Sequence, residues 1–251
     1  MKTMYDSTFF EQQKSGSQRA AECVVPLVLK HVNATSVVDV GCGVGTWLKA
    51  FKASGIKNIL GMDGDYVHRE QLQIETTEFK PFDLRERLKI TGRFDLAISL
   101  EVAEHLPPER AASFVRDLTL LADVVLFSAA IPFQGGTNHL NEQWQGYWRD
   151  LFKTQNYTAC DVIRPVIWDN QDVPLWYRQN TLLYVNEDGL KRCSARALEG
   201  SIISVVHPEQ YLLRSDPARI QRKFGGIMHV YYSLRNLRRR LFADRAEESQ
   251  G

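Results

Sequence analysis

Three glycines at alternate positions link a predicted strand to a predicted helix. The run Ser36–Val40 is rich in β-branched residues, as a buried strand is, and a helical pattern begins at Thr46. Glycine lets the chain turn sharply and lets a ligand approach the main chain. The first N–H groups of the helix are free to bind an electron-rich group. We therefore expect a ligand to bind at Gly41, Gly43 and Gly45.

Two acidic residues near this loop indicate which chemical groups the ligand carries. Asp39 lies two residues before Gly41, where a carboxylate would repel a pyrophosphate but could hold an ammonium group. The spacing G-x-G-x-G also differs from the G-x-G-x-x-G of dinucleotide-binding loops. Asp63 ends the next predicted strand, 20 residues after Gly43, the distance at which a carboxylate meets ribose hydroxyls. The predicted ligand has a ribose and an amino-acid end and needs no phosphate.

A polar stretch after a later strand could remove a proton from a substrate. Residues 128–144 combine Gln, Asn, His, Glu and Trp side chains with a Gly-Gly pair. His139 is our first candidate for a general base, because imidazole titrates near neutral pH. Glu142 belongs to the same predicted catalytic group, and His105 is the second candidate base, with a structural role as its alternative. A flat face for a sugar ring, or else a helix packing face, is predicted at Trp144, Tyr147 and Trp148.

The elements that position these residues alternate between strands and helices. The predicted strands are 36–40, 58–62, 94–100, 124–128, 157–163 and 181–185, and the predicted helices are 20–31, 46–54 and 108–121. This alternation indicates βαβ units and a mostly parallel sheet. No good helix is predicted between the last two strands, which favours antiparallel pairing at one edge. Ligands of such sheets bind beyond the carboxyl ends of the strands, where the candidate residues are expected.

The glycine loop and the strand at 94–100 resemble class I S-adenosylmethionine-dependent methyltransferases. Residues 39–45 are similar to the first motif of that family, and residues 94–106 to its fourth-strand motif with a Glu-His pair. The resemblance covers residues 36–186. It implies an α/β, Rossmann-like fold: a seven-stranded, mostly parallel sheet with a reversed edge strand. It also implies S-adenosyl-L-methionine as the cofactor.

The resemblance assigns cofactor contacts to loops that follow the strands. It implies that Asp39 holds the methionine end, Asp63 the ribose and Asp83 the adenine amino group. The other implied contacts are Gly41, Cys42, Gly43, Gly45, Thr46, Gly64, Leu84, Leu100 and Glu101. A second resemblance, to the metal ligands of small-RNA 3′-terminal ribose methyltransferases, involves Glu101, Glu104, His105 and His139. Metal-free relatives share that pattern, and we expect no metal.

The expected activity is that of an enzyme of class EC 2.1.1.-, O-methylating a hydroxyl of a sugar or glycan precursor. The polar loop and residues 164–180 resemble methyltransferases associated with bacterial surface-polysaccharide biosynthesis, which points to a small-molecule or glycan acceptor. Two alternatives stay open. One is ribose methylation of small RNA, and the other is a non-catalytic subunit that binds the cofactor.

Length and composition fit one domain with appended segments. The chain has 251 residues and a formal charge of +1, which argues against a global electrostatic grip on nucleic acid. Its apolar runs are too short for a membrane span. Its four scattered cysteines fit the cytoplasm. We expect an N-terminal helical lid at 1–35, the methyltransferase domain at 36–186 and a C-terminal helical extension at 187–251.

The extension ends in a basic segment at residues 219–241. Its arginines and its leucines at helical spacing predict an amphipathic helix. Such a helix could pack on the domain or on a partner copy, contact an anionic membrane surface, or contact RNA phosphates. The sequence leaves the oligomeric state open.

Overall fold

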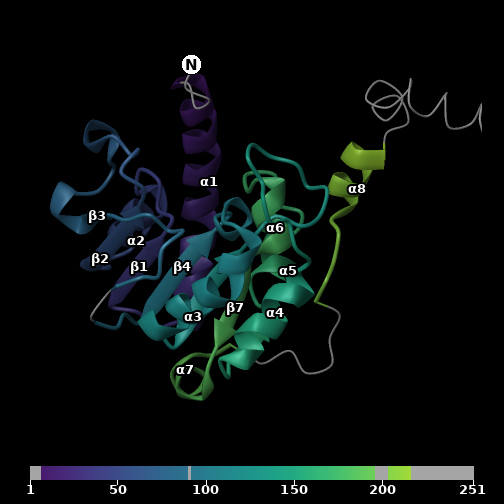
Figure 1. Cartoon of the computed structure of the whole chain (residues 1–251). Helices are drawn as coiled ribbons and strands as arrows, with labels where there is room; N and C mark the ends of the chain where they lie inside the picture. The colour runs from purple at the N-terminus through teal and green to yellow at the C-terminus, as the bar shows by residue number, and fades with distance from the viewer. Residues whose placement is uncertain (1–6, 90–91, 196–202, 216–251) are drawn as a thin grey trace, which may run out of the picture. The chain divides into compact units, whose positions relative to one another are not determined.

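A seven-stranded sheet forms the centre of the fold (Figure 1). The computed structural model describes residues 7–89, 92–195 and 203–215. The strands are β1 (Ser36–Val40), β2 (Asn58–Asp63), β3 (Phe79–Pro81), β4 (Leu96–Leu100), β5 (Val124–Ser128), β6 (Thr158–Cys160) and β7 (Leu182–Val185). Their order is β3-β2-β1-β4-β5-β7-β6. β7 runs antiparallel to both β5 and β6, and the other pairs are parallel. The predicted mostly parallel sheet with a reversed strand is confirmed.

The helices follow the predicted alternation, with additions in the second half. They are α1 (Ser7–His31), α2 (Thr46–Ala53), α3 (Ala111–Leu121), α4 (Gln145–Thr154), α5 (Arg164–Ile167), α6 (Leu175–Asn180), α7 (Glu187–Arg192) and α8 (Pro208–Ser215). α1 begins well before the predicted start of a helix at residue 20. Two short helices, α5 and α6, join β6 to β7, where the sequence predicted no good helix. They bring polar residues of α6 close to the functional end of the sheet.

Both faces of the sheet are covered by helices (Figure 1). Successive side chains of a strand point to opposite faces, so neighbouring residues of β1 enter different cores. Val37 belongs to one buried cluster with Val28 of α1 and Phe51 of α2. Val38 belongs to the other, which includes Phe114 of α3 and Phe152 of α4. Burial on both sides fixes the strands, and the carboxyl ends of the parallel strands meet at one edge.

The compact unit that carries the sheet extends past the predicted domain end at residue 186. It comprises Met1–His207, and a second unit comprises Pro208–Gly251. Within the first unit, Val32 forms an antiparallel bridge with Cys193, next to α7. α1 also contributes to the core, so it does more than cover a ligand. The first six residues of the predicted lid and the basic segment 219–241 lie outside the described residues.

No helix in the described part of the chain is both long enough and apolar enough to cross a membrane.

A buried arginine attaches the start of α3 to the loop after β3. Arg110 donates to Asp117 Oδ2 at 2.5 Å, to the Glu86 carbonyl at 2.8 Å and to the Leu84 carbonyl at 3.1 Å. Both charged side chains are almost fully buried. Without Arg110, Asp117 keeps the donors Arg87 Nε and Leu88 N–H, each at 2.9 Å, but the buried Leu84 and Glu86 carbonyls lose the Arg110 donors.

Replacing Arg110 by methionine should therefore lower the free energy of unfolding by about 2 kcal/mol, through the lost buried hydrogen bonds. The matched control is Arg149→Ala, because the Arg149–Asp150 pair is exposed and should contribute less than about 1 kcal/mol. Urea denaturation followed by circular dichroism measures both variants. Equal losses of stability would contradict a structural role for the buried pair.

Candidate active site

The glycine loop leaves an open space beside one of its residues. Gly41, Gly43 and Gly45 have φ angles of +92°, +53° and +83°, which side chains rarely adopt. A Cβ atom on Gly41 would lie 2.3 Å from Val102, and one on Gly45 would lie 2.9 Å from Ile74. A Cβ atom on Gly43 would meet nothing within 4 Å. The loop is therefore packed on two sides and open at Gly43, where a ligand can approach the main chain.

Asp39 is a buried carboxylate with one oxygen that accepts no hydrogen bond. Its side chain sits at the end of β1 with 2% of the residue exposed, and no hydrogen-bond donor reaches its Oδ2 atom. Burial, with a smaller contribution from the charge of Asp63, raises the pKa of Asp39 well above its ordinary value. A bound ammonium group would satisfy this carboxylate, as the sequence predicted for the methionine end of the cofactor.

Asp63 links β2 to the glycine loop. Its Oδ2 accepts a hydrogen bond from the Gly43 N–H at 2.7 Å, and its Oδ1 accepts one from the Gly64 N–H at 2.7 Å. The Tyr66 hydroxyl also donates to Oδ1. Burial raises the pKa of Asp63, and these hydrogen bonds oppose the shift. The carboxylate is thus oriented beside Gly43, where ribose hydroxyls were predicted to bind.

The predicted adenine contact, Asp83, is bound elsewhere in this structure. Its carboxylate accepts hydrogen bonds from the main-chain N–H, Nε and Nη2 of Arg85, the last at 2.6 Å, and these contacts lower the pKa of Asp83. The neighbouring Leu84 is buried, and the Phe82 N–H donates to the Asp63 carbonyl at 2.7 Å. The segment thus lies beside the end of β2, but an adenine amino group would have to compete with Arg85.

The remaining predicted cofactor contacts line the same edge of the sheet. Cys42, Thr46 and Leu100 are buried, and the Thr46 hydroxyl accepts a hydrogen bond from Gln73 at 3.1 Å. Burial raises the pKa of the Cys42 thiol well above its ordinary value. Cys42 is therefore a packing residue and not a nucleophile.

Glu101 is held by amide groups that sequence reasoning missed. It follows β4 with φ +56°, and its carboxylate accepts hydrogen bonds from Gln134 Nε2 at 2.9 Å and Asn180 Nδ2 at 3.3 Å. Asn180 also donates to Gln134 Oε1 at 2.8 Å. Burial raises the pKa of Glu101. Gln134 lies in the predicted polar stretch 128–144 and Asn180 at the end of the segment 164–180, but the sequence did not indicate that both contact Glu101.

Glu104 is a second buried acidic residue of the site. None of its side-chain surface is exposed, and its carboxyl group interacts with the Glu101 carboxyl and with the main chain of Ala130. Burial, with the nearby charge of Glu101, raises the pKa of Glu104 well above its ordinary value. Its main-chain carbonyl accepts hydrogen bonds from the N–H groups of Leu140 and Asn141 at 2.8 and 3.0 Å. These bonds attach the loop after β5 to the loop after β4.

The three predicted catalytic residues lie together at this junction. The rings of His105 and His139 meet edge to face, with centroids 4.9 Å apart. Glu142 Oε1 lies 2.8 Å from His139 Nδ1, and the Glu142 carboxylate also accepts the N–H groups of Phe133 and Gly135. Burial and the nearby His139 lower the pKa of His105. The polar loop is therefore ordered around one carboxylate–imidazole pair.

The three aromatic residues divide between the two predicted roles. Trp148 is 1% exposed and packs against Phe127 in the core, with ring centroids 5.2 Å apart, as the packing-face alternative predicted. Trp144 and Tyr147 are 44% and 36% exposed, and Trp176 of α6 is 40% exposed. These three rings remain available to a ligand.

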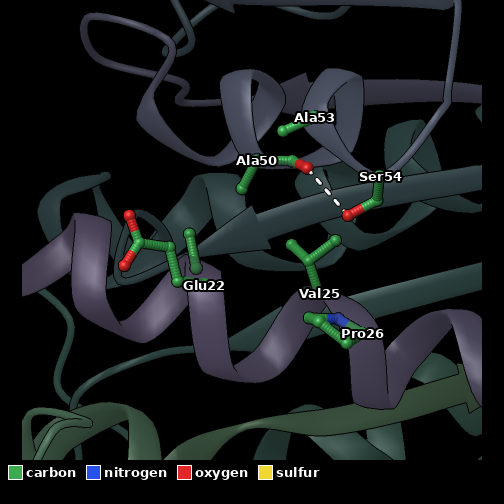
Figure 2. Close-up of a pocket in the computed structure, with 7 residues that line it drawn as sticks. Glu22, Val25, Pro26, Ala50, Ala53 and Ser54 are labelled. Carbon is green, nitrogen blue, oxygen red and sulfur yellow. Dashed lines mark hydrogen bonds between the residues drawn. The ribbon is translucent and has the colours of Figure 1, made fainter.

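A pocket between α1 and α2 offers no comparable chemistry (Figure 2). Its lining consists of Ala21, Glu22, Val25, Pro26, Ala50, Ala53 and Ser54. The Ser54 hydroxyl donates to the Ala50 carbonyl at 3.0 Å, and Glu22 accepts a hydrogen bond from Gln18 at 2.9 Å. The pocket has small, mostly apolar walls, and its polar groups have partners.

Comparison with known proteins identifies the family. Residues 11–158 match the methyltransferase domain family, so the chain belongs to that family. A solved S-adenosylmethionine-dependent methyltransferase from Archaeoglobus fulgidus is similar, with 17% identity over 72% of this chain and 99% of that one, at a TM-score of 0.52. Magnesium protoporphyrin IX methyltransferase from Synechocystis PCC 6803 has 19% identity over 74% of this chain and 87% of that one, at a TM-score of 0.48. The comparison with curated proteins found no match.

Substitution of Gly43 by alanine tests the open space beside the glycine loop. A methyl group there has room in this structure but would occupy the predicted ligand position, so binding of S-adenosylhomocysteine should weaken about tenfold or more. Gly55→Ala is the matched control, because Gly55 also has a positive φ of +97° and nothing within 4 Å. Both should lose about 1 kcal/mol of stability. Titration calorimetry showing equal binding by both variants would contradict this placement.

Substitution of Asp39 by asparagine tests the unpartnered carboxylate. Losing a charged hydrogen bond should weaken binding of S-adenosylhomocysteine about 10- to 100-fold. The folded pKa of Asp39 is raised, so its contribution to stability is complete below the unfolded pKa of about 4 and is lost as pH rises through the folded pKa. The ligand-free variant should therefore lose less stability than the wild type between those pH values.

Thermal unfolding across that pH range and calorimetry measure the two effects. The exposed Asp65→Asn is the control and should change neither. Unchanged ligand affinity in the Asp39 variant would contradict the assignment.

Proposed function

We propose that this protein transfers the methyl group of S-adenosyl-L-methionine to a hydroxyl of a sugar or glycan precursor. Membership of the methyltransferase domain family supports the transfer and its cofactor. The proposal of a hydroxyl acceptor rests on one observation. His139 and Glu142 form a pair, with an Nδ1···Oε1 distance of 2.8 Å, in the loop after β5. The free thiols fit our expectation of a cytoplasmic enzyme.

The cofactor side would use the groups described at β1 and β2. Asp39 would accept the amino group of the methionine end, which supplies the missing partner of its buried Oδ2 atom. Asp63 would bind the ribose, exchanging its contact with the Tyr66 hydroxyl for one with the sugar. The cofactor supplies an activated methyl on a sulfonium centre. The chain's own task is to hold that methyl in line with the incoming oxygen.

An acceptor hydroxyl must lose its proton as the new bond forms. Glu142 is positioned to accept the Nδ1–H of His139, and in that neutral tautomer Nε2 carries no proton and can act as the base. His139 Nε2 would take the hydroxyl proton while the oxygen–carbon bond forms and the sulfur–carbon bond breaks. The products are the methyl ether, S-adenosylhomocysteine and a protonated imidazole. Glu142 would stabilise that charge.

Exposed aromatic rings of the chain would suit a polyhydroxylated ring. Trp144, Tyr147 and Trp176 expose aromatic surface, on which the apolar face of a sugar can stack. Hydroxyl groups of the sugar could exchange hydrogen bonds with the nearby amides and carboxylates. An association with surface-polysaccharide biosynthesis stays part of this proposal.

Replacing His139 by alanine should lower turnover at least about 100-fold, because it removes the base, while leaving binding of S-adenosylhomocysteine intact. The assay measures methyl transfer to a panel of nucleotide sugars, oligosaccharides and small RNA. His68→Ala, at an exposed position outside the cluster, is the control. Undiminished turnover in the His139 variant would overturn the base assignment, and methylation of RNA alone would overturn the sugar assignment.

A further inference from the structure

We propose that Phe133 binds the acceptor, with its ring stacked on the apolar face of the sugar. This inference rests on the proposed function and deepens it, because it names a residue that selects the acceptor. Phe133 follows β5, in the polar loop that also carries His139 and Glu142. Among the residues that the structure describes, no large apolar residue is more exposed than Phe133, at 84%.

The backbone of Phe133 adopts a conformation that does not suit a phenylalanine. Residues 131–134 form a turn, closed by a hydrogen bond of 2.9 Å from the Gln134 N–H to the Ile131 carbonyl. Pro132 holds the second position of this turn, and Phe133 holds the third position with φ +65°. A positive φ at the third position normally calls for glycine or asparagine, because a side chain with a bulky Cβ substituent is strained there. The turn by itself would therefore favour another residue.

Contacts on both sides of Phe133 fix this turn at the functional edge of the sheet. The Phe133 N–H donates to Glu142 Oε2 at 2.7 Å, and the other oxygen of that carboxylate lies 2.8 Å from His139 Nδ1. The next residue, Gln134, is buried and donates to Glu101 Oε2 at 2.9 Å. One turn thus connects the proposed base to a predicted cofactor contact, and the Phe133 ring extends from the main chain between them.

Packing does not explain a phenylalanine at this position. At 84% exposure the residue buries little apolar surface, so it adds little to the stability of the core. Residues that are held in rarely populated backbone conformations cluster at active sites and ligand-binding positions. Contact with an acceptor would bury the exposed ring and would explain why an aromatic residue occupies the turn.

The chemistry of the ring indicates which part of the acceptor it binds. Phenylalanine offers an apolar aromatic face and has no side-chain hydrogen-bond donor. That face suits the CH groups on one side of a sugar ring, while the hydroxyls at the edge of the ring are left for polar groups such as His139. Since Phe133 transfers no proton, its contact should be equally strong in the ground state and in the transition state. Loss of such a contact raises KM and leaves kcat unchanged.

Methyl-transfer kinetics of Phe133→Asn test this role, with the panel of nucleotide sugars, oligosaccharides and small RNA as acceptors. KM for the acceptor should rise about tenfold, because the stacking contact is lost. The value of kcat, its pH dependence and the affinity for S-adenosylhomocysteine should match the wild type. The midpoint of thermal unfolding should not fall, since asparagine tolerates a positive φ. Phe133→Tyr keeps the ring and should retain the wild-type KM. Leu120→Ala, at a 57% exposed position of α3, is the matched control and should change none of these quantities.

An unchanged acceptor KM in Phe133→Asn would overturn the role of Phe133. A fall in kcat alone would also overturn it, because that result indicates a residue that only supports the loop. RNA as the sole methylated acceptor would overturn the sugar contact.

Saturation-transfer difference NMR with UDP-glucose, UDP-galactose and GDP-mannose gives a readout that needs no turnover. If the wild type binds one of these sugars but methylates no acceptor, the proposed function fails. A weaker signal from Phe133→Asn would then still support the contact, and an equal signal would overturn it. If no sugar of the panel is bound or methylated, both proposals fail.

Discussion

The burial of carboxyl groups is the constraint that organises the functional edge of this protein. Asp39 is the last residue but one of β1 and Glu104 follows β4, and both carboxyl groups are almost fully buried. Burial raises the pKa of both groups, so each ionises more readily beside a positive charge. For Asp39 we propose that this charge is the ammonium group of the cofactor.

The well-packed sheet supplies the stability that allows these carboxyl groups to be buried. Both faces of β1 and β4 pack against apolar cores, and all five residues of each strand are buried. The ends of β1 and β4 are therefore fixed in position. The loops that follow can hold buried carboxyl groups there, although burying such groups costs free energy. A stable scaffold can carry a few costly groups at its functional end because the remaining core supplies the free energy.

The sequence predicted the parts of the fold that local pattern determines. β1 and β5 have the predicted bounds, because each is a short, mostly apolar run whose five residues are all buried. β3 was missed because Phe79–Pro81 becomes a strand only through pairing with β2. For the same reason, the contacts of Gln134 and Asn180 with Glu101 depend on tertiary structure. The predicted catalytic residues did converge, since they follow neighbouring parallel strands.

One loop connects the two halves of the site. Val102 packs over Gly41, close enough that a Cβ atom on Gly41 would lie 2.3 Å from it. A few residues later, the Glu104 carbonyl holds the loop that carries His139, through the N–H groups of Leu140 and Asn141. A shift of the loop after β4 would therefore move the glycine loop and the imidazole pair together. Since methyl transfer requires the donor and the acceptor in line, this shared attachment is how the fold can fix both.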